Sequence, residues 1–327
     1  MGTKTSSKPQ QHPSSSSLPS STVPTQPPPS SPPQPQQQQQ QPPDDELKEF
    51  QFDEYAIITQ LGQGTFGKIY LVRNKRTDHL YSMKKIILSE ELDLELIIKE
   101  YQLCHKLKHS NIVEILGIFK RQLDITTYVI YILMEVGMSD WEKEIKSHSD
   151  KSKPYTEQEL LNILTQLVSC LSFLQRQGVS HRDIKPQNVL TFKGGVYKIA
   201  DFGEAKQIEK ISQHRQINTL RGTELYMSPL LYNGLRCNQL DIKHNLFKSD
   251  VYSLGLCMLF AATLSVNSIY EIRKIVDMKN IRTFLERLLV KKYSESFIKL
   301  LGDLWELNEM NRPDFIELEK LLTQEGK

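Results

Sequence analysis

The sequence is poor in cysteine, has almost no net charge and contains no long apolar run. Its cysteines are Cys104, Cys170, Cys237 and Cys257. They are widely scattered, without the spacing of zinc ligands or of a redox pair, which favours a reducing compartment. No stretch reaches the ~18 apolar residues that a membrane span needs. The start, MGTKTSSKPQ, lacks the apolar core of a secretory signal. We therefore expect a cytoplasmic protein.

The formal net charge of +2 comes from Lys4 and Lys8, so the chain from residue 44 onward is neutral. A neutral body gives no electrostatic reason to expect nucleic acid as a partner. Residues 1–43 contain no acidic residue but hold 12 of the 16 prolines and a glutamine run. Such a segment has almost nothing to bury, and ordering it would cost conformational entropy without return. We expect residues 1–45 to form a disordered tail.

Two short patterns in this tail suggest contacts. PTQP at Pro24–Pro27 resembles a proline-helix ligand and predicts a partner protein that binds proline motifs. A solvated spacer could have the same composition. Gly2 followed by Ser6 fits the pattern for N-myristoylation, which also matches by chance. One acyl chain binds membranes with a constant of only about 10⁴ M⁻¹. The tail offers no cysteine as a second anchor, so any peripheral membrane contact would be weak and reversible.

From Phe52 the pattern becomes that of a folded α+β domain. Branched and aromatic residues predict strands over 55–61, 68–73, 80–88, 114–119 and 128–134, with one helix over 92–107. After Gly137 the pattern is mainly helical. Thr156 and Glu159 form a capping box that opens a leucine-rich helix. Further helices are expected over 247–264, 281–289, 294–305 and 315–322. We expect a β-rich N-lobe at about 52–136 and a helical C-lobe at about 137–323.

Three motifs carry the candidate chemistry, and the first is Gly62-Gln63-Gly64-Thr65-Phe66-Gly67. Glycines allow backbone amides to approach phosphates closely. In dinucleotide-binding folds a helix follows this pattern, whereas here KIYLVRN predicts a strand. The second motif is Lys84 on the third strand, which could hold phosphates if Glu100 on the next helix fixes its ammonium group. Taken alone, Lys84 and Glu100 could also form an ordinary surface ion pair. Strand alternation points Lys85 to the opposite face.

The third motif is His181-Arg182-Asp183-Ile184-Lys185-Pro186-Gln187-Asn188. Phosphoryl transfer needs an acceptor for the hydroxyl proton, positive charge near the migrating group and oxygen ligands for Mg²⁺. Asp183, Lys185 and Asn188 supply these in turn. Asp201, in the following Asp-Phe-Gly, adds a hard oxygen ligand. Asp-Phe-Gly alone would indicate only a turn, but chance does not place an eight-residue loop of this composition before it.

Together these motifs resemble the eukaryotic protein kinase superfamily, over about 52–323. The resemblance implies a bilobal kinase fold that binds Mg²⁺ and ATP and phosphorylates protein substrates. It implies catalytic roles for Asp183, Lys185, Lys84 and Glu100, and metal ligation by Asn188 and Asp201. It places at the nucleotide Leu61, Gly62, Gly64, Gly67, Ile69, Ser82, Lys84, the gatekeeper Met134, Glu135 and Gly137. Ser82 replaces the usual alanine and needs a hydrogen-bond partner.

The Lys185-Pro186 pair resembles serine/threonine kinases, and so does Gly222-Thr223, whose threonine counterpart bonds the catalytic Asp and Lys. Arg182 before the catalytic Asp is a feature of kinases switched on by activation-loop phosphorylation, which implies an upstream activating kinase. A phosphate there would pair with Arg182. Thr219 is the expected acceptor and Ser212 the second choice; an ordinary loop threonine is the alternative.

One position departs from the family pattern. Leu230 stands where the family has a glutamate that pairs with the arginine of a late Arg-Pro, here Arg312-Pro313. An unpaired buried arginine would cost several kcal/mol, so Arg312 must find another acceptor or lie exposed. We expect a less rigid activation segment. Asp250 matches the family aspartate that braces the catalytic loop.

Two alternatives to an active protein kinase remain. A pseudokinase scaffold is favoured by Leu230 and by the tail. The catalytic set is complete, however, whereas inactive relatives usually lose one member: Lys84, Glu100, Asp183, Lys185, Asn188 and Asp201. A small-molecule kinase of similar fold is the second alternative, but Gly222-Thr223 and Arg312-Pro313 resemble protein kinases more closely.

Overall fold

The computed structural model describes residues 50–64, 67–89, 91–208 and 216–325. The chain divides into two units, Met1–Asp44 and Asp45–Lys327, and the description below concerns the second. The predictions for the tail, including the proline motif and Gly2, lie outside the described residues, as does Ser212.

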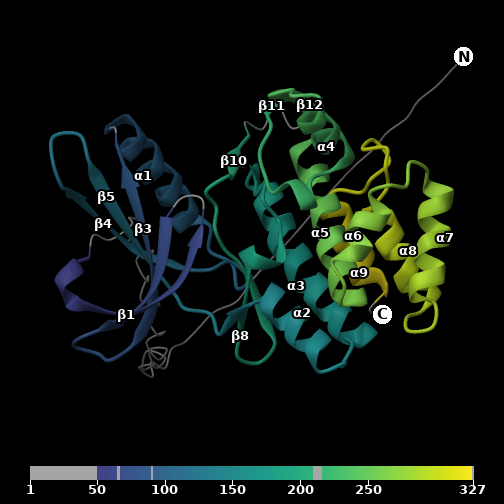
Figure 1. Cartoon of the computed structure of the whole chain (residues 1–327), viewed down its shortest axis with the longest axis horizontal. Coiled ribbons are helices and arrows are strands. Elements are labelled where there is room, and N and C mark those ends of the chain that lie inside the picture. The colour runs from purple at the N-terminus through teal and green to yellow at the C-terminus, as the bar shows by residue number, and fades with distance from the viewer. Residues whose placement is uncertain (1–49, 65–66, 90, 209–215, 326–327) are drawn as a thin grey trace, which may run out of the picture. The chain divides into compact units, whose positions relative to one another are not determined.

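The N-terminal part of the domain is an antiparallel sheet with the strand order β1-β2-β3-β5-β4 (Figure 1). A short 3₁₀ turn, Phe52–Glu54, precedes it. The elements are β1 Tyr55–Gly64, β2 Gly67–Asn74, β3 Leu80–Leu88, α1 Glu91–Lys106, β4 Ile115–Gln122 and β5 Tyr128–Met134. All five predicted strands and the predicted helix are therefore present, within a few residues of the expected limits.

The two faces of this sheet bury different side chains. Met83, Leu133 and Val72 pack with Phe50 and a group of aromatic rings on one face. Ile86 and its neighbours on β5 belong to the large core that also contains residues of α1. Because side chains alternate along a strand, Lys84 lies on the face of Ile86. Lys85 lies on the other face, with its ammonium group 5.8 Å from the Tyr131 ring centroid.

Gly67 is required where β2 begins. Its φ of +146° is one that other residues rarely adopt, and a Cβ there would lie 2.1 Å from the carbonyl oxygen of Lys85. The glycine therefore lets β2 lie directly against β3 at the open end of the hairpin.

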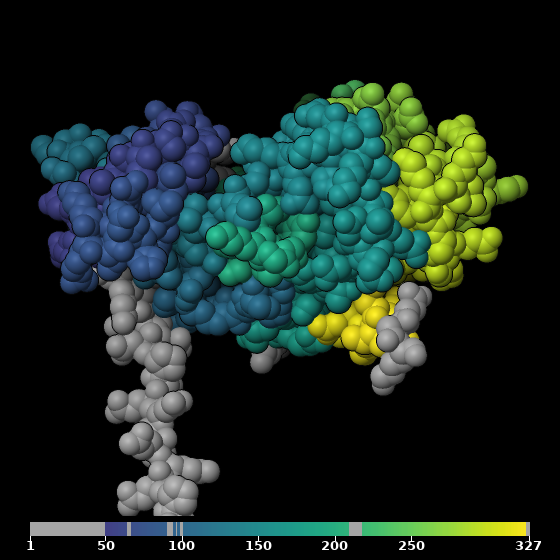
Figure 2. Space-filling model, turned by 90° about the horizontal axis from the view of Figure 1, so that it is seen from below, coloured from purple at the N-terminus to yellow at the C-terminus, as the bar shows by residue number. Residues whose placement is uncertain are grey.

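The C-terminal part is mainly helical, with short strands among the loops (Figure 1). Its helices are α2 Trp141–Asp150, α3 Glu157–Arg176, α4 Pro229–Arg236, α5 Leu246–Thr263, α6 Asn267–Ile272, α7 Met278–Leu289, α8 Glu295–Leu304 and α9 Phe315–Glu325. Its short 3₁₀ turns are Pro186–Asn188 and Glu224–Tyr226. Its strands are β6 Ser139–Asp140, β7 Val179–Ser180, β8 Val189–Phe192, β9 Val196–Ile199, β10 Lys206–Gln207, β11 Gln216–Thr219 and β12 Asp241–His244. The hairpin of β8 and β9 reaches the surface of the face shown in Figure 2.

Helix α5 forms the centre of this part. Every residue from Leu246 to Ala262 except Lys248 is buried. The helix is long and apolar enough to cross a membrane by length and composition, but 83% of the relevant stretch is buried inside the domain. Core helices of folded domains have the same composition. The helix predicted over 247–264 is confirmed.

The predicted capping box at the start of α3 is also confirmed. The Thr156 hydroxyl accepts a hydrogen bond from the Glu159 amide at 3.2 Å, and the Glu159 carboxylate accepts one from the Thr156 amide at 2.7 Å. The expected apolar face is at most 2% exposed: Leu160, Ile163, Leu164, Leu167, Leu171 and Leu174. A fully buried leucine contributes roughly 1.5–3 kcal/mol, so this face fixes α3 within the core.

The bilobal α+β kinase fold predicted from the sequence is thus confirmed. The short elements were not foreseen, notably α2, α4, α6 and the two-stranded sheet of β11 and β12. Four-residue strands give too few positions for an alternating pattern to stand out. Their partners, such as β12 for β11, lie more than 20 residues away along the chain.

The capping box predicts a specific stability change. Thr156→Ala removes the oxygen that accepts from the Glu159 amide, so the free energy of unfolding should fall by about 1 kcal/mol. Urea denaturation would measure this, with Thr156→Ser as the control because serine keeps the acceptor. Equal stability of the alanine and serine variants would contradict a contribution from the cap.

Candidate active site

A buried carboxylate fixes the catalytic loop to the core. Asp250 on α5 is 3% exposed and accepts hydrogen bonds from the Ser180 hydroxyl at 2.7 Å and from the amides of His181 and Arg182, both at 2.9 Å. Burial raises the pKa of Asp250, while the charge of His181 and these hydrogen bonds oppose the rise. Arg182 has a φ of +67°, a conformation rare outside glycine. The loop is therefore held in a strained conformation by one acceptor.

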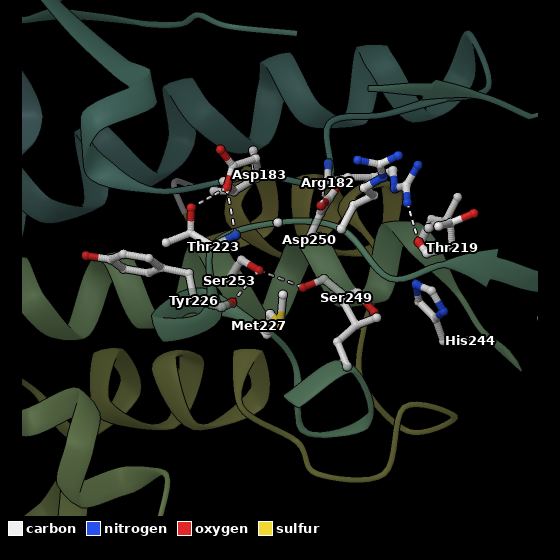
Figure 3. Close-up of a pocket in the computed structure, with 15 residues that line it drawn as sticks. Arg182, Asp183, Thr219, Thr223, Tyr226, Met227, His244, Ser249, Asp250 and Ser253 are labelled. Carbon is white, nitrogen blue, oxygen red and sulfur yellow. Dashed lines mark hydrogen bonds between the residues drawn. The ribbon is translucent and has the colours of Figure 1, made fainter. Parts of the chain in front are cut away.

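The side chain of Asp183 accepts hydrogen bonds from two segments, and Figure 3 shows those from Thr223. Its Oδ1 accepts from the Thr223 amide at 2.9 Å and from the Thr223 hydroxyl at 2.7 Å. Its Oδ2 lies 2.6 Å from Lys185 Nζ, which also donates to the Thr223 hydroxyl at 2.8 Å. Burial alone would raise the pKa of Asp183, but the hydrogen bonds from Lys185 and Thr223 and the Lys185 charge lower it below the usual value. The carboxylate is ionised at neutral pH.

Asn188 connects this cluster to the segment that carries Asp201. Its side-chain nitrogen donates to the backbone oxygen of Asp183 at 2.9 Å and to its Oδ2 at 3.0 Å. Its backbone oxygen accepts from the Ala200 amide at 2.8 Å. The side-chain nitrogen of Asn188 is thus committed to Asp183, and the Asn188 backbone lies next to Ala200, the residue that precedes Asp201.

Lys84 and Asp201 meet across the two parts of the domain. Lys84 Nζ lies 2.6 Å from Asp201 Oδ1, and the lysine is only 4% exposed. Burial works against both charges, but their attraction dominates. It lowers the pKa of Asp201, and together with Tyr101 it raises the pKa of Lys84. Asp201 has a φ of +58°. Glu100, the predicted partner of Lys84, belongs to α1, and its side chain lies outside the described part of the chain.

His181 has a structural environment. It is fully buried, its Nε2 is 3.0 Å from the Ala200 carbonyl oxygen, and its ring packs edge-on against Phe202 at 5.0 Å between centroids. These contacts join the catalytic loop to the Asp201 segment, so His181 has a structural role.

The predicted nucleotide-contacting residues come from β1, β2, β3 and the end of β5. Ile69 is paired with Lys84 in the β2–β3 ladder, and Ser82 with Met134 in the β3–β5 ladder. The Ser82 hydroxyl donates to the Glu135 carbonyl oxygen at 2.9 Å, which supplies the partner that a buried hydroxyl needs. Leu61 is 45% exposed on β1.

The resemblance places Glu135 at the nucleotide, but its side chain is bonded to other parts of the protein. Its Oε1 accepts from the Glu114 amide at 2.7 Å, and both carboxylate oxygens accept from Lys198 Nζ at 2.7 Å. At Gly137 an added Cβ would lie 3.0 Å from the Leu190 Cβ. The segment from Glu135 to Gly137 is thereby tied to β8 and β9.

The oxygen atoms at this site suit Mg²⁺. The Asp201 carboxylate and the Asn188 amide oxygen are hard ligands, and Mg²⁺ is usually bound by one or two carboxylates together with substrate phosphates. Within the described part of the chain, no cluster of three or more His, Cys, Asp and Glu side chains could hold a metal ion alone. One carboxylate and one amide oxygen form a donor set that fits Mg²⁺ bound together with phosphate oxygens.

The activation segment continues from Asp201 and is anchored at several points. The Arg182 guanidinium donates to the Thr219 carbonyl oxygen at 2.5 Å. β11 pairs with β12, and Thr219 lies opposite Asp241. Gly222 has a φ of +106°, and a Cβ there would lie 2.6 Å from the Arg182 carbonyl oxygen. Only glycine allows this close approach of the two segments.

Arg312, which lacks the usual glutamate, is buried at 2% exposure rather than exposed. It donates to the carbonyl oxygens of Glu306 and Lys248, both at 2.8 Å, and lies 4.9 Å from the Tyr252 ring centroid. Burial lowers the pKa of Arg312 to about 10, opposed by Tyr252, Glu309 and Glu306. Of the two expected outcomes, Arg312 has therefore found other acceptors. They are main-chain oxygens, which no residue pattern reveals.

The sequence interpretation also missed two side chains that position the site. Ser180 precedes the catalytic loop and bonds Asp250. Arg273, after α6, donates to the segment that follows Thr223. Ser180 could have been found as a hydroxyl next to the motif. Arg273 could not, because nothing in its local pattern indicates a contact almost 50 residues away.

Comparisons with known proteins agree with this geometry. Residues 55–323 match the family described as "Protein kinase domain". A Dictyostelium discoideum protein, "Probable serine/threonine-protein kinase nek2", is 30% identical over 274 residues, which cover 81% of this chain and 62% of that protein. "Serine/threonine-protein kinase Nek2" of Mus musculus is 27% identical, with 81% and 59% covered. The chain spans about three fifths of the length of both relatives.

The environment of Arg312 predicts that its substitution destabilises the protein more than substitution of a partly exposed arginine. Arg312→Ala removes two hydrogen bonds and leaves nearby buried acidic charge uncompensated, so the free energy of unfolding should fall by about 3 kcal/mol or more. Arg176→Ala, which breaks a partly exposed pair with Glu319, should cost less than about 1 kcal/mol. Chemical denaturation measures both. Similar values for the two variants would contradict this account.

Proposed function

The chain belongs to the protein kinase family, and we propose on this premise that it transfers the γ-phosphoryl group of ATP to serine or threonine hydroxyls of protein substrates. One observation carries the proposal. A single hydrogen-bonded cluster contains Asp183, Lys185, Asn188 and Thr223. The pair of Lys84 and Asp201 adjoins this cluster, because the residue before Asp201 bonds the backbone of Asn188. A proton acceptor, two ammonium groups and two oxygen ligands are thereby available to one phosphoryl group.

Asp183 would orient the substrate hydroxyl and accept its proton. Its lowered pKa keeps the carboxylate ionised at neutral pH, and Thr223 and Asn188 fix its orientation. Lys185 Nζ, 2.6 Å from Asp183 Oδ2, would stabilise negative charge on the transferred group. Such positioned electrostatic groups account for most of the catalysis in phosphoryl transfer.

Asp201 and Asn188 would hold Mg²⁺, which when bound neutralises phosphate charge, and Lys84 would align the phosphates. Lys84 and Asp201 pair with each other at 2.6 Å. A metal at Asp201 and phosphates at Lys84 would each replace the partner that is lost, so both buried charges stay compensated. The pair of Lys84 and Asp201 therefore keeps both side chains charged before nucleotide binds.

Specificity for serine and threonine is supported by the Lys185-Pro186 and Gly222-Thr223 motifs. Thr223 contacts both Asp183 and Lys185. The relatives named above are described as serine/threonine-protein kinases.

We also propose activation by phosphorylation of Thr219 by an upstream kinase. Thr219 is exposed, and its carbonyl oxygen already accepts from Arg182. Lys206 donates to the neighbouring Asn218 side chain at 2.8 Å. Two cations therefore lie next to this residue, and a phosphate carrying about −1.5 to −2 charge could recruit them.

A pseudokinase scaffold is the second candidate, favoured by Leu230. The complete set of catalytic residues supports activity instead, since Asp183 and Lys185 are both bonded to Thr223, and Asn188 and Asp201 are present as metal ligands.

Asp201→Asn tests the proposed activity directly. Loss of the carboxylate charge should reduce Mg²⁺-dependent transfer from labelled ATP to a mixed peptide library by at least about 10³-fold, because little other metal ligation remains. The fold should persist, and circular dichroism checks this. If wild-type protein labels no serine or threonine peptide under conditions where it binds Mg-ATP, the pseudokinase reading holds instead.

The role of Thr219 predicts a three-way comparison. Wild-type protein phosphorylated at Thr219 should turn over at least about tenfold faster than phosphatase-treated protein, because the phosphate orders the loop through charge-assisted hydrogen bonds. Thr219→Ala should match the treated form and gain nothing from an activating kinase. Equal turnover of all three forms would refute regulation at this residue.

A further inference from the structure

The loop of residues 224–227, between Thr223 and α4, is held by an unusual run of contacts. Four consecutive carbonyl oxygens accept hydrogen bonds from side chains of the helical core. Arg273 donates from Nη2 to Glu224 at 2.6 Å and to Met227 at 2.8 Å, and from Nε to Leu225 at 3.0 Å. Ser253 on α5 donates to the carbonyl oxygen of Tyr226 at 2.7 Å.

Arg273 is well placed for this contact. It directly follows α6, whose Ile269 and Ile272 are buried, so its backbone is fixed in the core. Its guanidinium lies 4.4 Å from the Tyr232 ring centroid on α4. A planar guanidinium presents several donors in a rigid arrangement, which lysine cannot reproduce. One side chain therefore joins α6 to both ends of the 224–227 loop and to the helix that follows it.

The same loop adjoins the catalytic centre. Thr223, immediately before it, donates twice to Asp183. At the other end the side chain of Leu230 has no hydrogen-bond acceptor, and the hydrogen bonds of Arg312 go to the carbonyl oxygens of Glu306 and Lys248 instead. The anchoring that a glutamate at position 230 would provide to this segment is thus absent, and Arg273 supplies a different anchor at residues 224, 225 and 227.

We propose that Arg273 is the positioning residue that holds the 224–227 loop in the conformation that binds the protein substrate. The inference rests on the proposed kinase function. The loop directly follows the threonine that contacts the proton acceptor, so a peptide whose hydroxyl reaches Asp183 would lie next to it. Arg273 donates to the backbone of the loop and is remote in sequence from Lys84, Asn188 and Asp201, so it should govern peptide binding rather than nucleotide binding.

The test compares Arg273→Ala, Arg273→Lys and, as a matched control, Lys274→Ala. Lys274 is the adjacent exposed cation. With a serine peptide selected from the library, Arg273→Ala should raise the peptide KM about tenfold or more, because several charge-assisted hydrogen bonds are lost. The KM for ATP should stay within about twofold of wild type, because the proposal gives Arg273 no part in nucleotide binding. Arg273→Lys should be intermediate, and Lys274→Ala should resemble wild type.

Hydrogen exchange provides a readout that does not depend on catalysis. Amides of residues 224–228 should exchange faster in Arg273→Ala while those of β3 and β5 do not change. A purely structural role would instead lower the unfolding midpoint and raise exchange throughout the domain. Wild-type activity with an unchanged peptide KM in Arg273→Ala would overturn the inference. An inactive wild type in which Arg273→Ala still loosens residues 224–228 would refute the proposed function and leave the anchoring intact.

Discussion

The buried carboxylate of Asp250 determines the geometry of the whole site. It accepts three hydrogen bonds from residues 180–182, and it sits on α5, the most deeply buried helix. An unpaired carboxylate there would be very unfavourable, so the backbone of Arg182 must keep its amide turned toward it even at a φ of +67°. That conformation turns the chain at Arg182 and directs the next side chain, Asp183, toward Thr223.

Helix α5 positions the substrate side of the site as well as the catalytic side. Ser249, one residue before Asp250, has its hydroxyl 3.2 Å from that of Ser228, and Ser253 bonds the Tyr226 carbonyl oxygen. Three neighbouring residues of one helix thus hold two segments: Asp250 holds the catalytic loop, whereas Ser249 and Ser253, at i and i+4, hold residues 226–228. Since a core helix cannot move without disrupting its packing, the catalytic loop and the 224–227 loop keep a constant relation to each other.

Two kinds of feature could be predicted from the sequence: secondary structure with a clear local periodicity, and sites whose residues lie close together in a short motif. The five N-lobe strands, the leucine face of α3 and its capping box follow from periodicity and from residues four or fewer positions apart. The motif residues Asp183, Asn188 and Asp201 were also identifiable, since side chains of that type occur together for few other reasons. The β11–β12 pairing, the Arg273 contacts and the acceptors of Arg312 could not be foreseen. In each of these the partner is a backbone group, and any residue can supply a carbonyl oxygen.

The same distinction bears on whether Leu230 argues against activity. A buried ion pair repays little more than its own desolvation, and replacing its acid need not destabilise a protein if the remaining charge is satisfied. Here Arg312 is satisfied by two carbonyl oxygens, by the Tyr252 ring and by the charges of Glu306 and Glu309. Arg273 separately anchors the loop that the missing glutamate would have steadied. The departure at position 230 therefore changes how the segment is held. Whether this kinase transfers phosphate is decided by the groups around Asp183 and Asp201, which Leu230 does not touch.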